Sequence, residues 1–244
     1  MTALIYNGHR LDDILYYGSP EITILASTVN YADNKSRDGS VVLGRKWDRS
    51  SVSFNVYAVG TPLDRRNALS TLGMWLDVDE PKPLYLPDTP DRYYLAMPTG
   101  KLELNRCIDG EVGKLEFDIT DPVAYGEERS ITLGRVNGSE ATVLVNGTYP
   151  TRPVIHDSKA VGDVSNQIWG VRLDGSEYMH IDVGYNQHDL VVDCSERSVV
   201  SDTSVKVPTL DSDWFELTPG VHTFLRDLGR SYADATITWQ ERWL

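Results

Sequence analysis

The chain has 244 residues, of which 41% are apolar and 24% are charged, a balance typical of a soluble globular protein rather than a disordered one. Its formal net charge is −13 and both halves are acidic, which argues against tight binding of nucleic acid. No apolar run approaches the about 20 residues of a membrane-spanning helix, and the first residues lack the pattern of a signal peptide, so we expect no membrane insertion and no signal-directed export.

Residues 1–58 predict short strands and one long hairpin. Short apolar groups at 14–17 and 22–26 are followed by a polar stretch at 34–40 that is typical of an exposed loop. From residue 52, apolar side chains alternate with polar ones as in a half-buried strand. The apolar run 41–43 is the expected partner, with 44–51 as the hairpin tip.

The expected hairpin carries a local group of basic residues, although the chain as a whole is acidic. Trp47 lies in its expected tip. The basic side chains are Lys35, Arg37, Arg45, Lys46 and Arg49. Three interpretations stay open: a solvated loop, a charged arm that meets an acidic partner, and a nucleic-acid patch, for which the run is short. Trp47 is either an exposed interface anchor or part of a tip that folds back.

A single amphipathic helix is predicted over 62–76. Thr61 is a suitable N-cap, Pro62 fits the first helical position, and Asp64 completes the spacing of a capping box. A stripe of apolar residues at helical spacing follows: Ala68, Leu69, Leu72, Trp75 and Leu76. Gly73 weakens a helix by roughly 1 kcal/mol relative to Ala, which suggests close packing at that position.

The rest of the chain is predicted to be all β. Strands expected at 84–86, 92–97 and 115–119 are closely spaced, as in an antiparallel sheet. After residue 130 short strands alternate with Asn-Gly, Asp-Gly and Pro-Gly turns, at the frequency of a β-sandwich. We therefore expect a mainly β protein with two sandwich domains, 1–129 and 130–244.

The sequence offers little that could perform chemistry. Cys107 and Cys194 are far apart and are expected to be reduced, buried thiols. His180 and Asp182 would share a strand face, so a His–carboxylate pair is possible there, although ordinary histidines are the simpler interpretation. No nucleophile elbow, P-loop or dinucleotide motif occurs. We expect no catalytic residue, no metal site and no cofactor.

The order of several segments resembles the distal tail (Dit) family of siphophages. The segments are EPKPLYLPDTPDRYYLAM (Glu80 to Met97), KLEFDITDPVAYG (Lys114 to Gly126), NGTYPTRPVI (Asn146 to Ile155), MHIDVGYNQHDLVVD (Met179 to Asp193) and WFELTPGVHTF (Trp214 to Phe224). Together they span nearly the whole chain, and the strand that ends in Asp-Pro-x-x-Tyr-Gly is the most specific of them.

This resemblance implies a structural protein of the virion tail tip, assembled in the cytoplasm of the bacterial host. It implies a hexameric ring that joins the tail tube, built of the major tail protein, to the tail-associated hub or lysin protein of the tail tip or baseplate. A receptor-binding protein is a further possible partner. The belt hairpin would be Val41–Ala58, the ring helix Pro62–Leu76, and the C-terminal domain a galectin-like sandwich. The oligomer interface expected on the hairpin consists of Val41, Val42, Leu43, Trp47, Val52, Phe54 and Val56.

The residues agree with this implication, because an isolated two-stranded arm is marginally stable and a neighbouring copy could bury it. The negative charge also suits a lumen through which DNA slides without binding. Two other functions stay open. One is a carbohydrate-binding module for host wall polysaccharide, which would need an exposed aromatic platform at Trp169 or Trp214. The other is a wall hydrolase, for which no motif is present.

Overall fold

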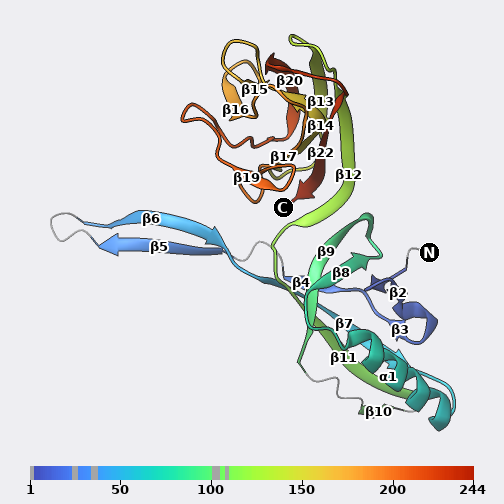
Figure 1. The fold of residues 1–244 in the computed structure, drawn as a ribbon. Coiled ribbons are helices and arrows are strands. Elements are labelled where there is room, and N and C mark those ends of the chain that lie inside the picture. Colours follow the sequence, from blue (N-terminus) through green and yellow to red (C-terminus); the bar gives the residue numbers. More distant parts are fainter. Residues whose placement is uncertain (1–2, 24–26, 34–37, 101–104, 108–109) are drawn as a thin grey trace. The chain divides into compact units, whose positions relative to one another are not determined.

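The computed structural model describes residues 3–23, 27–33, 38–100, 105–107 and 110–244 (Figure 1). The chain divides into two compact units, unit 1 with Met1–Tyr125 and Leu244, and unit 2 with Gly126–Trp243. The division falls at Tyr125, rather than after residue 129. Strands dominate both units, and the prediction of a mainly β chain is confirmed.

Unit 1 is built on an antiparallel sheet in which β7 lies between β11 and two short strands. The order at its centre is β9-β11-β7, with β3 and β4 on the other edge of β7, β8 on β9, β10 on β11, and β1 between β8 and β2. The bounds are β1 Ile5–Tyr6, β2 His9–Arg10, β3 Tyr16–Tyr17, β4 Glu21–Thr23, β7 Ser50–Ala58, β8 Lys82–Leu86, β9 Thr89–Thr99, β10 Asn105–Cys107 and β11 Gly110–Ile119. A short 3-10 helix, Leu11–Asp13, follows β2.

The alternation of apolar and polar side chains along the strands explains which residues form the core of unit 1. Val52, Phe54 and Val56 of β7 are at most 1% exposed, as the alternating pattern predicts. Phe117 of β11 contacts Phe54 edge-on and packs 4.9 Å from the ring of Tyr6. The inner faces of β7 and β11 therefore form one apolar layer.

Helix α1 runs from Pro62 to Leu76, as predicted. The capping box is present: the Asp64 N–H donates to the Thr61 hydroxyl at 3.2 Å, and the Thr61 N–H donates to the Asp64 carboxylate at 3.0 Å. Leu72 is buried, and the ring of Trp75 stacks on His9 at 4.7 Å. The end of α1 is thereby held to the core through its apolar stripe.

The expectation of close packing at Gly73 is wrong for the single chain. A Cβ placed on Gly73 would have no atom within 4 Å, because this residue lies on the exposed side of α1. The glycine therefore lowers helix stability without a compensating contact in the described part of the chain.

Unit 2 consists of two sheets with a shared core. One sheet has the order β19-β18-β17-β14-β22-β12, with β21 also paired to β14, and the other has the order β13-β20-β15-β16. The bounds are β12 Ala124–Leu133, β13 Glu140–Val145, β14 Val154–Val161, β15 Ile168–Leu173, β16 Glu177–Asp182, β17 His188–Asp193, β18 Ser198–Ser201, β19 Ser204–Lys206, β20 Gly220–Leu228, β21 Arg230–Ser231 and β22 Ala235–Trp243. Strand β12 begins in unit 1, where Tyr125 pairs with Tyr93, and continues in unit 2.

Both sheets of unit 2 contribute side chains to one apolar cluster. Val192 and Ile237 come from the first sheet, and Val171 and Phe224 from the second; all four are fully buried. Trp239 is 6% exposed and belongs to the same cluster.

The exposed glycine of α1 gives a prediction about stability. Replacement of Gly73 by Ala should raise the free energy of unfolding of unit 1 by roughly 0.5–1 kcal/mol, since helix propensity improves and no contact is lost. Urea unfolding followed by circular dichroism measures the change. Gly110→Ala is the control and should destabilise, because its Cβ would lie 2.4 Å from the Ala58 carbonyl oxygen. A destabilised Gly73→Ala variant would contradict the prediction.

Candidate oligomer interface

Strands β5, Ser27–Asp33, and β6, Ser40–Trp47, form a separate two-stranded ribbon, which we call the arm (Figure 1). Its register continues that of the core pair β4/β7: Thr23 pairs with Ser51, and Ser27 pairs with Trp47. The arm is thus the outward continuation of a ribbon whose other end is fixed in the sheet of unit 1.

The predicted hairpin of residues 41–58, in which β6 would pair with β7, is therefore wrong. Strand β6 pairs with β5, which precedes it, rather than with β7. Both edges of β7 are already occupied, by β11 on one side and by β3 and β4 on the other. Since a strand has two hydrogen-bonding edges, β6 cannot pair with β7 and must leave the sheet. The stretch 44–51, predicted as a tip, consists mainly of the end of β6 and the start of β7.

Alternation gives the arm two different faces. Directly paired residues share a face, so Val29 and Tyr31 of β5 lie beside Arg45 and Val42 of β6, with Trp47 on the same face. The apolar residues among these five are Val29, Tyr31, Val42 and Trp47, and we call them the apolar face of the arm. The opposite face carries Thr28, Asn30 and Lys46, with Ala32 and Val41 among them. A register shift next to Tyr31 leaves Leu43 as an extra residue of β6.

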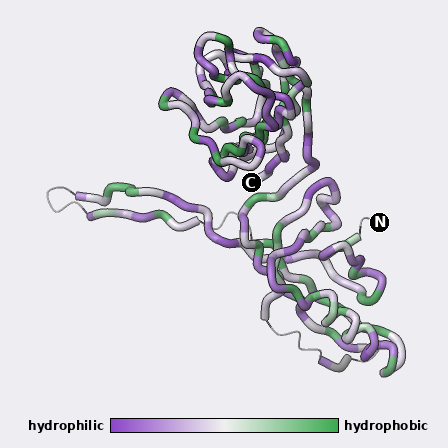
Figure 2. The backbone as a smooth tube through the Cα atoms, viewed as in Figure 1, coloured by the Kyte–Doolittle hydropathy of each residue, from purple (hydrophilic) through white to green (hydrophobic). Residues whose placement is uncertain are grey.

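Large apolar side chains of the arm are exposed to solvent. Tyr31 is 62% exposed, Val42 59% and Leu43 68%, and the described part of the chain places no core cluster against them. Figure 2 shows this hydrophobic stretch of β6 among hydrophilic neighbours. A row of exposed apolar side chains on a two-stranded ribbon is typical of a surface that becomes buried in an assembly.

Charged groups fix the base of the arm. The guanidinium of Arg45 lies 4.2 Å from the ring centre of Trp47, so the arginine covers one face of the indole. Asp48 accepts one hydrogen bond from the Thr28 hydroxyl and lies 3.4 Å from Lys46. The Thr28 hydroxyl is the main reason that the pKa of Asp48 is lowered. The predicted basic residues Lys35 and Arg37 lie outside the described residues.

The predicted interface residues divide into two groups. Val41, Val42, Leu43 and Trp47 lie in the arm, with Trp47 half-buried. Val52, Phe54 and Val56 lie in β7 and are buried in the core of their own unit, so their expected place on an interface is wrong. Sequence reasoning missed Tyr31 and Val29, although their alternation with polar neighbours was a usable signal.

All four histidines of unit 2 contact aspartates that are distant in the sequence. His180 binds Asp211 at 3.1 Å through Nδ1 and Asp227 at 3.0 Å through Nε2, rather than Asp182. The Asp182 carboxylate instead accepts the N–H of Gly184. The other pairs are His156–Asp189, His188–Asp202 and His222–Asp174. Each pair joins two loops or strands, which is a structural role.

The remaining candidate residues are two cysteines and two tryptophans. Cys194 is fully buried, and burial raises the pKa of its thiol to about 12, which suppresses the reactive thiolate. The side chain of Cys107 lies outside the described residues. Trp169 is fully buried and Trp214 packs against the core of unit 2, so neither offers an open platform for a sugar. Among the described residues, no group of His, Cys, Asp or Glu is arranged to hold a metal ion.

A buried ion pair organises one end of unit 2. Asp157 and Arg226 are both fully buried and 3.0 Å apart. The Asp157 carboxylate also accepts hydrogen bonds from the indole N–H of Trp169 at 2.9 Å and from the hydroxyl of Ser231 at 2.5 Å. The network ties β14, β15, β20 and β21 together. It has no access to solvent and is structural.

No helix in the described part of the chain is long and apolar enough to span a membrane.

Comparisons with known proteins agree across the chain. The family model described as siphovirus-type tail component, C-terminal domain, matches residues 146–243. The distal tail protein of Bacillus phage SPP1 is 30% identical over 258 residues, which cover 99% of this chain and 96% of that protein. The crystal structure of the SPP1 Dit protein aligns over 100% of both chains with a TM-score of 0.76 and 21% identity, which shows the same fold.

The buried pair gives a prediction about stability. Arg226→Met would leave the Asp157 carboxylate buried without its counter-ion and should cost about 3–5 kcal/mol of unfolding free energy. Urea unfolding at neutral pH measures this cost, with the exposed Arg135→Met as a control that should change stability by less than about 0.5 kcal/mol. Equal stability of the two variants would contradict a structural role for the pair.

The His188–Asp202 pair gives a prediction about pH. Hydrogen bonds from the His188 ring and the Asp189 N–H lower the pKa of Asp202 in the folded state. A lowered folded-state pKa contributes stability above the unfolded pKa of about 3.9, and this contribution is lost as the pH falls through the folded value. The stability advantage of the wild type over Asp202→Asn should therefore be full at pH about 5 and shrink below pH about 4. Urea midpoints measured at several pH values test this, and a constant difference would contradict it.

Proposed function

The chain belongs to the distal tail protein family of siphovirus-type phages and is a structural protein of the phage tail; from this we propose that it forms a ring, of six copies as the resemblance implies, that joins the tail tube to the tail-tip hub. In this ring the arm of each copy packs on the next copy. The protein acts by binding and positioning its partners, without a catalytic step.

The exposed apolar side chains of the arm carry this proposal. Burial of a side chain such as Tyr31, Val42 or Leu43 contributes roughly 1.5–3 kcal/mol, and the single chain leaves most of that contribution unrealised. The pairing of β4 with β7 has the same register as the pairing of β5 with β6, so the base of the arm follows strands that are fixed in the core sheet. Stable contacts between subunits bury about 800 Å² on each partner, an area that a two-stranded arm can contribute when both its faces are used.

A ring requires a receiving surface that differs from the arm. Tyr16 of β3 and Tyr57 of β7 are directly paired on the outer face of the sheet and are 67% and 41% exposed. We assign this tyrosine pair as the receiving surface. An arm that binds a different patch on the next copy makes a head-to-tail contact, and such contacts close into a ring when the rotation between copies is constant.

Further details of the proposal concern the lumen, the partners and the place of assembly. They follow from the net charge of the chain and from the family to which it belongs. The net charge of −13 suits a lumen along which DNA passes without sticking, since phosphates find few compensating cations. The partners are further copies of this chain, the major tail protein of the tube, and the hub protein of the tip. Unit 2 is a galectin-like sandwich. Assembly takes place in the host cytoplasm, and the product remains at the tip of the virion tail.

A single charge on the arm should prevent ring formation. Val42→Asp would bury a carboxylate in the apolar contact and should weaken association by at least about 100-fold, leaving a folded monomer. Size-exclusion chromatography with light scattering measures the mass, and negative-stain microscopy shows whether rings form. Leu144→Asp is the matched control, because Leu144 is also 59% exposed but lies in unit 2, and it should leave the ring intact.

Two outcomes would oppose the proposal. Rings of unchanged mass in the Val42→Asp variant would remove the arm from the interface. A wild-type protein that stays monomeric over a wide concentration range, both alone and after mixing with purified hub protein, would remove the ring itself.

A further inference from the structure

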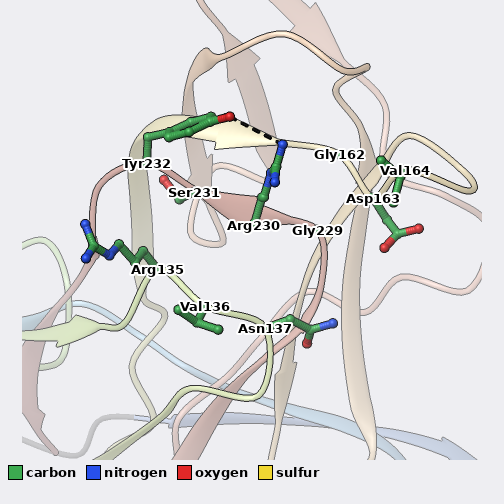
Figure 3. A pocket seen from close by; sticks show the side chains of 10 residues that line it. All are labelled: Arg135, Val136, Asn137, Gly162, Asp163, Val164, Gly229, Arg230, Ser231 and Tyr232. Atoms are coloured by element: carbon green, nitrogen blue, oxygen red, sulfur yellow. Dashed lines mark hydrogen bonds between the residues drawn. The ribbon is translucent and has the colours of Figure 1, made fainter.

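Unit 2 has a surface pocket and a fastened loop that the proposed function does not use. The pocket has a cavity volume of about 440 Å³ and is lined by segments that follow β12 and β14 and by β21. Figure 3 shows that the side chains of Arg135 and Arg230 point in different directions, and Arg230 donates to the hydroxyl of Tyr232. The polar groups of this pocket therefore do not converge on one point, whereas those of the loop do.

The loop of residues 207–213 follows β19 and lies along the edge of β16 that does not pair with β15 (Figure 1). We call this loop the strap. Its Thr209 N–H donates to the His180 carbonyl at 2.9 Å, and its Asp213 N–H donates to the Tyr178 carbonyl at 2.6 Å. An open sheet edge offers unpaired backbone groups to other strands, and the strap occupies those of β16.

The side chain of His180 fastens the strap to the sheet. Its Nδ1 lies 3.1 Å from the carboxylate of Asp211 on the strap, and its Nε2 lies 3.0 Å from the carboxylate of Asp227 on β20. Gly170 of β15, which pairs with His180, makes room for the ring, because a Cβ on Gly170 would lie 2.5 Å from the imidazole Cδ2. With its side chain only 9% exposed, the imidazole is held between the two carboxylates.

This geometry requires the charged form of the imidazole. Both ring nitrogens of His180 face carboxylate oxygens, which accept hydrogen bonds and cannot donate them when ionised. A neutral imidazole has one N–H, whereas the imidazolium has two, so only the imidazolium donates to both aspartates. After loss of one proton, a nitrogen lone pair would face a carboxylate oxygen, and that contact would become repulsive.

The two aspartates differ in their other partners. Asp227 also lies 3.4 Å from Arg172 of β15, so it keeps a cation when the imidazole is neutral. In the described part of the chain, Asp211 has His180 as its one cationic partner. Hydrogen bonds from the Thr209 hydroxyl and from His180 lower the pKa of Asp211, so this carboxylate is ionised at neutral pH. The strap is therefore the side that loses its fastening when the imidazole loses a proton.

The neighbours of His180 on its own strand are Tyr178 and Asp182. The ring centre of Tyr178 lies 5.4 Å from that of the imidazole, and this phenol is uncharged at neutral pH. The carboxylate of Asp182 accepts the N–H of Gly184 in the turn that follows β16. The charge of the imidazole therefore acts mainly on the two aspartates described above.

We propose that His180 is a proton-controlled latch, which holds the strap over the edge of β16 as an imidazolium and releases it on losing a proton. The fastening is complete on the acid side of neutrality, where the imidazole is charged and Asp211 is still ionised, and it is lost as the pH rises. Release uncovers the backbone groups at the edge of β16. The latch lies within unit 2 and does not depend on ring formation.

Amide exchange of the full chain, measured by NMR, reports opening of the strap. From about pH 6 to about pH 9, the protection factors of the Thr209 and Asp213 amides should fall about tenfold, because a hydrogen bond to a charged group is lost. Protection of β14, in the other sheet of unit 2, should stay constant. The ring ¹⁵N shifts of His180 should be those of an imidazolium at about pH 6 and should change over the pH interval in which the strap opens.

Two variants separate the latch from general loosening of unit 2. His180→Gln removes the titrating group, and Asp211→Asn removes the carboxylate of the strap at a side chain that is 65% exposed, so the second variant keeps the fold. In both, protection of the strap should change less than about twofold between about pH 6 and about pH 9. His156→Gln is the matched control, because it removes an imidazole paired with an aspartate in the other sheet, and it should keep the wild-type pH dependence.

Three results would overturn the latch. The first is a strap whose protection in the wild type does not change with pH. The second is a wild-type fall in protection that persists in Asp211→Asn. The third is a set of ring nitrogen shifts that shows a neutral imidazole at about pH 6.

Discussion

The arrangement of unit 1 depends on the occupation of both edges of β7. Strand β11 pairs along the whole length of β7, and β3 and β4 share the opposite edge. Because no edge is left, the chain that enters β7 from β6 arrives from outside the sheet. Its partner is β5, which follows β4 in the sequence and keeps the register of the β4/β7 pair. The arm is therefore a consequence of sheet topology, and its register is inherited from the core.

The register that the arm takes from the core sheet helps its two strands to stay paired. An isolated hairpin must nucleate its own strand pairing and is marginally stable. The strands of the arm, in contrast, follow a register that is already set where Thr23 pairs with Ser51. Its base is further fixed by Arg45 on Trp47 and by Asp48 beside Lys46. The apolar face can thus remain exposed without the strands losing their pairing. The proposed contact between copies requires this combination of ordered strands and exposed apolar surface.

The sequence predicts local features well and pairing poorly, for a physical reason. The bounds of α1 follow from Thr61, Pro62 and Asp64, which act within one turn, and the burial of Phe54 follows from alternation within one strand. Which strand pairs with β6 is decided by β11, which lies far away in the sequence. The polar residues 44–51 resemble a turn because an exposed arm carries the same composition as a loop. Gly73 shows the converse error, since a costly residue need not have a compensating contact in the single chain.

The His180–Asp182 pair, which the sequence left open as a possibility, does not form in unit 2. Two residues apart on a strand, His180 and Asp182 share a face, yet the imidazole binds Asp211 and Asp227 from other segments. A carboxylate near a strand end has a competing use, because it can accept a backbone N–H two residues on, as Asp182 does at Gly184. Long-range His–Asp pairs then fasten the loops of unit 2, and Asp157 fastens its interior.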